Sequence, residues 1–96
     1  MASKRGGKGK GPGKWVTSPD YQAVVEVIVR ARNAAGMTQR DLATALGKTP
    51  SFVAKIEQRE RRVDLLELIA ISRALGIKEV DMLKSILVQL PRRIDL

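Results

Sequence analysis

Two kinds of side chain that enzymes and metal proteins depend on are missing from this sequence. None of its 96 residues is a cysteine or a histidine. Without cysteine the chain can form neither a disulfide framework nor a thiolate metal site. Without histidine it lacks the commonest metal ligand and the usual general base. We therefore expect no catalytic residue, no metal and no cofactor, and an enzyme is the functional class that the sequence supports least.

Aromatic residues and long apolar runs are also scarce. Aromatic side chains make up 3% of the residues, and no apolar run approaches the ~20 residues that a membrane-spanning helix needs. The basic N-terminus is not followed by the apolar segment of a secretory signal. The sequence therefore predicts a cytoplasmic protein that does not enter a membrane.

Positive charge is what the chain has in excess. Its formal net charge is +8, and five cations but no acidic residue fall within residues 1–18. A charge this large on a chain this short indicates a polyanionic partner. An anionic membrane surface would attract the same segment, but the segment lacks the apolar anchor that stable membrane binding needs. Nucleic acid is therefore the favoured partner, which would associate the protein with the nucleoid.

Residues 1–18 are rich in glycine and lysine, a composition that predicts a disordered arm. Such an arm can lie along phosphates or enter a minor groove. The alternative is a tail that only improves solubility, but the charge favours the arm. Trp15 is expected to attach the arm to the domain rather than to stack on a base. The candidate DNA-binding residues of the arm are Lys4, Arg5, Lys8, Lys10 and Lys14.

Capping residues and helical spacing predict an all-α domain over residues 19–90, followed by a tail at 91–96. Five helices are expected, at about 19–35, 38–46, 49–58, 64–75 and 78–90. Glycines end the first, second and fourth helices, and Pro91 ends the fifth because proline cannot continue a helix. The inward faces are expected to carry Val24, Val27, Ile28 and Ala31 in the first helix, and Leu65, Leu68, Ile71 and Leu75 in the fourth.

The stretch from Thr38 to Gln58 is the part around which the chain is organised. Thr38 is a natural N-cap, and Gly47 is the residue best able to end a helix in the left-handed conformation. Thr49 and Pro50 then start another helix at once. Two helices joined by so short a turn cross steeply, and Ala43 supplies the small side chain where they touch. This is the pattern of a helix-turn-helix.

These residues resemble the lambda-repressor-like (Xre-type) DNA-binding domains over roughly residues 21–83. The match is carried in order by Arg32, Gly36, TQRDLA at 38–43, Gly47, Val53, Ile56, Glu57, Arg61 and RALG at 73–76. One position departs from the family, because Arg59 stands where glycine is common after the recognition helix. Either the family's tight left-handed turn is absent there, or a non-glycine residue adopts the left-handed conformation at some cost.

The resemblance implies that the helix at about 49–58 is the recognition helix and lies in the major groove. Gln39 is expected to meet a phosphate, and Lys55 can donate to guanine O6 and N7. Phe52 has two equal interpretations, contact with a thymine methyl group or packing against the first helix. Pro50 offers only apolar contact, so DNA shape must add to the specificity. The groove-facing candidates are Thr49, Pro50, Ser51, Phe52, Lys55 and Gln58, and the phosphate-contact candidates are Arg40, Lys48, Arg59, Arg61 and Arg62.

Arg32 and Glu57 receive a structural role from the same resemblance. They are expected to pair across the first and third helices, so Glu57 is not interpreted as a catalytic acid.

The last two helices carry more apolar residues than one buried stripe needs, since Leu66 and Ile69 lie off the inward face. One interpretation is an isologous homodimer, and the other is that these residues complete the core of a monomer. The expected centre of the dimer interface is Met82, Leu83, Ile86, Leu87, Leu90 and Ile94.

Together these features predict a dimeric transcriptional regulator that binds a palindromic operator in double-stranded DNA and represses by occluding a promoter. One alternative is an antitoxin, whose second task is to bind a toxin protein. Another is a nucleoid-type DNA binder with little sequence preference.

Overall fold

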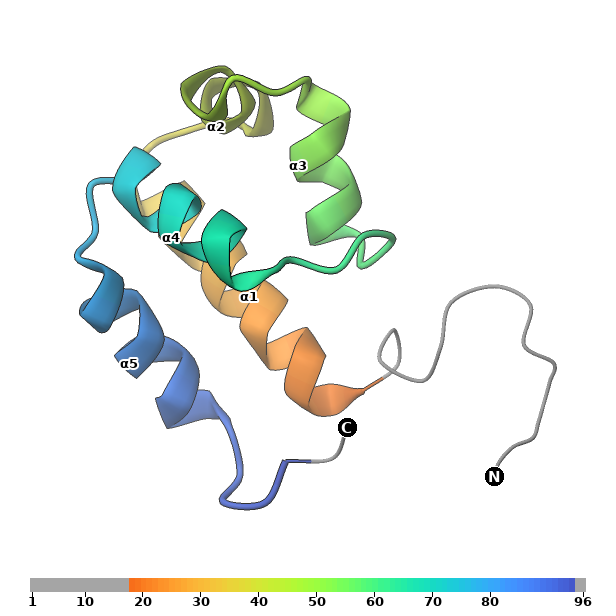
Figure 1. The fold of residues 1–96 in the computed structure, drawn as a ribbon, viewed down its shortest axis with the longest axis vertical. Helices are drawn as coiled ribbons and strands as arrows, with labels where there is room; N and C mark the ends of the chain where they lie inside the picture. The colour runs from red at the N-terminus through yellow and green to blue at the C-terminus, as the bar shows by residue number, and fades with distance from the viewer. Residues whose placement is uncertain (1–17, 95–96) are drawn as a thin grey trace, which may run out of the picture.

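The computed structural model describes residues 18–94, which form five α-helices and no strand (Figure 1). The helices are α1 (Pro19–Ala34), α2 (Gln39–Leu46), α3 (Pro50–Glu57), α4 (Leu65–Ala74) and α5 (Glu79–Gln89). Figure 1 shows α2 and α3 together at one end of the molecule. Helix α1 runs from that end toward the other, and α5 packs beside α1. The predicted all-α fold is confirmed, and the helices lie where the capping residues indicated.

Short-range hydrogen bonds explain where the helices begin. The hydroxyl of Thr38 accepts from the backbone N–H of Asp41 at 3.0 Å, and the Asp41 carboxylate accepts from the N–H of Thr38 at 2.9 Å. Asp64 and Glu67 form the same reciprocal capping box at the start of α4. Each box satisfies two N–H groups that have no partner within the helix. Because these partners are three residues apart, the sequence alone is enough to define the starts of α2 and α4.

The core is formed by side chains from all five helices. Ala43 is completely buried where α2 meets α3, as its small side chain predicted. Gly47 joins these two helices with a φ of 69°, the left-handed conformation expected there. The core residues are Val27, Ile28, Leu42, Ala43, Val53, Ile56, Ile71, Leu75, Met82 and Ile86. This packing fixes α3 relative to α1 and α2.

Two details of the helix faces differ from the prediction. Tyr21 and Val25 are buried in α1, although neither was assigned to its inward face. Leu65 was assigned to the inward face of α4, but it is 72% exposed. Its position explains the error, because Leu65 is the first residue of α4 and lies at the edge of a groove between α4 and α5. Across residues 18–94, no helix is long and apolar enough to cross a membrane.

Candidate nucleic-acid interface

The groove-facing candidates lie together on one side of α3. Thr49, Pro50, Ser51, Lys55 and Gln58 are all exposed, whereas Val53 and Ile56 point into the core. Thr49 occupies the N-cap position but makes no capping hydrogen bond. Its hydroxyl instead lies 3.0 Å from the hydroxyl of Ser51. The exposed face of α3 therefore starts with two hydroxyl groups that hold each other in place.

Phe52 is half-buried and packs against the core cluster, so the interpretation of Phe52 as a packing residue has direct support. Its ring also lies close to two cations. Lys48 Nζ is 5.4 Å from the ring centre, and the guanidinium carbon of Arg61 is 4.7 Å from it. Both distances are in the range of cation–π attraction. Phe52 thus brings two positive groups close to α3.

Arg32 and Glu57 form the predicted ion pair between α1 and α3. Arg32 Nε donates to Glu57 Oε2 at 2.7 Å, and Arg32 Nη2 donates to Oε1 at 3.0 Å. A third group joins the pair, since Gln39 Nε2 donates to Glu57 Oε1 at 2.8 Å. The resemblance assigned Gln39 to a phosphate and gave no sign of this bond. The carboxylate of Glu57 therefore connects the C-terminal end of α3 to both α1 and α2.

Arg59 adopts the left-handed conformation directly after α3, with a φ of 60°. It is the only non-glycine residue with positive φ among the residues the structure describes. The conformation lets the N–H of Glu60 bond back to the carbonyl of Lys55 at 2.8 Å, as in a Schellman motif. The chain thus keeps the family's tight turn without the family's glycine.

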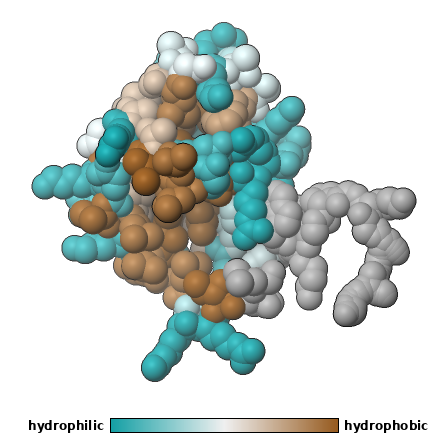
Figure 2. All heavy atoms as spheres, viewed as in Figure 1, coloured by the Kyte–Doolittle hydropathy of each residue, from teal (hydrophilic) through white to brown (hydrophobic). Residues whose placement is uncertain are grey.

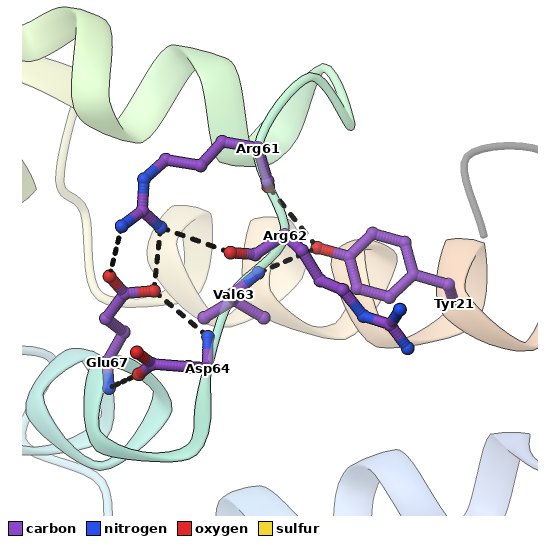
Figure 3. Close-up of polar contacts among 6 residues, drawn as sticks. All are labelled: Tyr21, Arg61, Arg62, Val63, Asp64 and Glu67. Carbon is purple, nitrogen blue, oxygen red and sulfur yellow. Dashed lines mark hydrogen bonds and ion pairs between the residues drawn. The ribbon is translucent and has the colours of Figure 1, made fainter. Parts of the chain in front are cut away.

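The residues after this turn are held by contacts that the sequence did not predict (Figure 3). The hydroxyl of Tyr21 accepts from the N–H of Val63 at 3.1 Å and donates to the carbonyl of Arg61 at 3.5 Å. The guanidinium of Arg61 binds both carboxylate oxygens of Glu67, at 2.8 and 2.5 Å. The capping-box spacing of Asp64 and Glu67 could have been recognised, but nothing in the sequence pointed to Tyr21.

The charges of this pair alter its titration. The guanidinium of Arg61 hydrogen-bonds the Glu67 carboxylate and thereby lowers the pKa of Glu67 below its ordinary value. The same hydrogen bonds raise the pKa of Arg61. Both groups therefore stay charged at neutral pH.

The remaining phosphate-contact candidates come from α2 and from the segments before and after α3. Arg40, Lys48 and Arg62 are exposed, and the guanidinium of Arg62 lies 5.7 Å from the ring centre of Tyr21. The predicted contacts of the arm, from Lys4 to Lys14, and the predicted anchor Trp15 lie outside the described residues. No group of three or more acidic side chains that could hold a metal ion occurs between residues 18 and 94.

The predicted dimer centre has to be corrected at two positions. Met82 is 1% exposed and Ile86 is 4% exposed, because both side chains fill the core of one chain. The other four predicted residues remain accessible, with Leu87 at 55% and Leu90 partly buried. Figure 2 shows apolar side chains gathered over α4 and α5 on the viewer's face. Exposed apolar residues there include Leu65, Leu66, Val80, Leu83, Leu87 and Val88.

A groove runs through this apolar surface. It has a volume of about 190 Å³ and is lined mainly by apolar side chains of α4 and α5, including Leu65, Ile69 and Leu83. Exposed apolar surface of this kind marks interaction sites on small proteins.

Comparison with protein families gives a match over most of the domain. The profile of a helix-turn-helix family matches residues 28–82, which is more than half of the chain. No curated protein matches the sequence.

Several solved structures share the fold. An XRE-family-like protein from Pseudomonas syringae pv. tomato is 39% identical with a TM-score of 0.69, over 75% of this chain and 88% of that one. The restriction-modification controller protein C.Esp1396I is 26% identical with a TM-score of 0.69, over 75% and 94% of the two chains. The clp gene regulator ClgR from Corynebacterium glutamicum is 25% identical with a TM-score of 0.64, over 72% and 73%.

Proposed function

This chain belongs to the Xre-type helix-turn-helix family, and we propose that it is a transcriptional regulator that binds double-stranded DNA sequence-specifically through α3. The observation that carries the proposal is the exposed polar face of α3. That face is rigidly supported, because Glu57 ties the helix to Arg32 and Gln39. A helix presented in this way is suited to the major groove.

Base contacts in this proposal come from a small set of side chains. Lys55 donates to guanine O6 and N7, and the hydroxyls of Thr49 and Ser51 can serve several bases. Pro50 adds apolar contact only. Because few hydrogen-bonding groups face the groove, specificity depends in part on the shape and deformability of the DNA.

Phosphate contacts supply the affinity. Gln39 lies at the start of α2, where its backbone N–H and the second N–H of its amide can meet one phosphate. Arg40, Lys48, Arg59 and Arg62 add positive charge around α3, and the lysine-rich arm extends the same field. The contacts of Tyr21 with the turn after α3 support this role of the arm, because α1 begins next to that turn.

The apolar surface of α4 and α5 is proposed to bind a second copy of the chain. Its exposed leucines and valines are what a self-complementary interface would cover. Two recognition helices about 34 Å apart would then read a palindrome in successive major grooves. We propose that such a dimer regulates transcription by occluding a promoter. The relatives named as a controller protein and a gene regulator favour a regulatory role.

The experiment that tests this function is selection of bound duplexes from a random pool, followed by salt titration on the best duplex and on a random one. We expect an enriched palindrome and a linear fall of log K with log[salt]. Lys55→Ala should shift the preferred base at a cost of ~1–3 kcal/mol. Arg30→Ala is the matched control, because it removes an equal charge from the exposed side of α1.

Each contrary result has a distinct meaning. Binding that does not depend on salt would refute the DNA-binding function. Equal loss by Lys55→Ala on selected and random duplexes would show that α3 does not read the bases. Salt-dependent binding without an enriched sequence would favour the nucleoid-type alternative, and tight binding of a toxin protein would favour the antitoxin.

A further inference from the structure

The turn between α3 and α4 is held by side chains from three different elements. Tyr21 comes from α1, Arg61 from the turn itself and Glu67 from α4 (Figure 3). Tyr21 and the turn are about 40 residues apart in sequence, yet the tyrosine hydroxyl joins the N–H of Val63 to the carbonyl of Arg61. We refer to Tyr21, Arg61 and Glu67 as the loop network.

The guanidinium of Arg61 makes three hydrogen bonds within the protein, although its side chain is 40% exposed. Nη1 donates to Glu67 Oε1 and to the carbonyl of Arg62, and Nη2 donates to Glu67 Oε2. The face of the guanidinium lies over Phe52. These three bonds are directed at Glu67 and at the backbone of its own loop, although Arg61 was a candidate for a phosphate contact.

Both carboxylate oxygens of Glu67 are also hydrogen-bonded within the protein. Besides Arg61 it accepts from the N–H of Asp64 at 3.0 Å, and its own N–H donates to Asp64 at 2.7 Å. A single carboxylate thus joins the start of α4 to the loop that follows α3. The two cations that flank Arg61 in this part of the chain are Arg59 and Arg62, so the network sets the path of the backbone that carries both.

We propose that Tyr21, Arg61 and Glu67 are positioning residues that pre-shape residues 59–63 for contact with the DNA backbone, and that Arg61 itself contacts no phosphate. The proposal rests on the proposed DNA-binding function. Its physical basis is preorganisation, since a loop that is already ordered loses less freedom when it binds. Arginine suits the task because its planar fork binds a carboxylate at two points, which lysine cannot do.

The main competing mechanism makes the opposite prediction. Glu67 could act as an internal substitute for phosphate that keeps Arg61 away from DNA. In that case Glu67→Gln would release Arg61, tighten DNA binding and add one phosphate contact. In the preorganisation mechanism the same change weakens binding, although it removes a negative charge.

The test measures DNA affinity and its salt dependence for Glu67→Gln, Tyr21→Phe, Arg61→Gln and Arg61→Lys, at a temperature where each variant is folded. We expect each to bind selected and random duplexes about tenfold more weakly, the effect of a free-energy change of about 1.4 kcal/mol. The slope of log K against log[salt] should stay unchanged, whereas loss of a phosphate contact lowers it by about 0.9. Glu26→Gln is the charge-matched control on the exposed side of α1, and it should bind like the wild type.

Arg61→Lys separates the two roles of the arginine. If Arg61 were a phosphate contact, lysine would preserve the charge and restore most of the affinity and the slope. If Arg61 positions the loop, lysine should fail as glutamine does. Restored binding by lysine, a lower slope for Arg61→Gln, or tighter binding by Glu67→Gln would each overturn the proposal.

Amide exchange in the DNA-free protein provides a second measurement that does not depend on the proposed function. Tyr21→Phe and Glu67→Gln should speed exchange of the Val63 N–H, because the first removes its acceptor and the second loosens the loop. Unchanged exchange would refute the loop network. Faster exchange in a protein that binds no DNA would instead refute only the proposed function.

Discussion

Arg32 and Glu57 face each other across α1 and α3 in a two-point ion pair with side-chain exposures of only 11% and 7%. Each charge therefore depends on the other for most of its polar contacts. Gln39 is the one other side chain that donates to the Glu57 carboxylate in the described structure. The pair explains how α3, a helix of only eight residues, is held firmly enough to present its outer face.

Removing one member of this pair should be far more damaging than removing both. We expect Glu57→Ala to lower the free energy of unfolding by ~3–5 kcal/mol, because Arg32 is left as a poorly solvated charge. The double variant Arg32→Met, Glu57→Met should recover much of the loss. Denaturant unfolding checks both, and Arg73→Ala, which breaks an exposed ion pair, is the control with little expected effect. An equally small effect of Glu57→Ala would mean that the pair is well solvated.

Replacing Arg59, whose backbone is left-handed, by glycine should stabilise the fold and weaken DNA binding. Glycine adopts this conformation freely, so Arg59→Gly should stabilise the fold by ~1 kcal/mol. It should also weaken DNA binding and lower the salt slope by about 0.9 if Arg59 meets a phosphate. Gly47→Ala is the opposite case: open space surrounds the added Cβ, but the backbone strain should destabilise by ~1 kcal/mol. Thermal unfolding of both variants should show shifts of opposite sign.

The arm should contribute to affinity for all sequences. Deleting residues 1–14 removes five cations, so we expect weaker binding to selected and random duplexes and a flatter dependence of log K on log[salt]. Replacing the same residues by an uncharged glycine–serine segment of equal length is the control for chain length, and it should behave like the deletion. An unchanged slope would exclude the arm as a phosphate binder.

Introducing a charge into the apolar surface of α4 and α5 should disrupt the proposed dimer. Leu87 is 55% exposed in the single chain, so Leu87→Arg should leave the fold intact and produce monomers if this surface covers itself in a dimer. Sedimentation measures the outcome. Gln22→Arg adds the same charge on the exposed side of α1 and should remain dimeric. A persistent dimer in Leu87→Arg would move the interface elsewhere.

The Arg61–Glu67 pair should make the stability of the turn depend on acid. The folded-state pKa of Glu67 lies below its unfolded value, so its contribution is complete above the ordinary glutamate pKa of about 4.3. It is then lost as the pH falls through the lower folded-state pKa. The difference in unfolding free energy between wild type and Glu67→Gln should therefore shrink between pH 7 and pH 3. A constant difference over that range would mean that Glu67 contributes without its charge.

The fold could be predicted from the sequence because its determinants are local. Thr38, Gly47 and Asp64 act on partners within a few residues, and apolar spacing identifies the inner side of each helix. The ion pair of Arg32 and Glu57 joins distant positions, and only the family resemblance made it predictable.

The misjudged features share a different cause, which is tertiary geometry. Met82 and Ile86 were assigned to a dimer surface from helical periodicity alone. Periodicity shows that such a residue is buried, but it does not show whether it is buried by its own chain or by a second copy. Leu65 continues the stripe of α4, yet it is the first residue of that helix and is 72% exposed. Tyr21 was overlooked because its hydrogen-bond partners lie about 40 residues away.

Tyr21 is also the only tyrosine in the sequence. A fluorinated tyrosine incorporated biosynthetically would therefore give one ¹⁹F resonance, from the ring whose hydroxyl bonds to Val63 and Arg61. That resonance would report on the shape of the turn in the free protein and during titration with DNA, without any substitution. The contact that positions the turn thus also provides a natural spectroscopic probe of it.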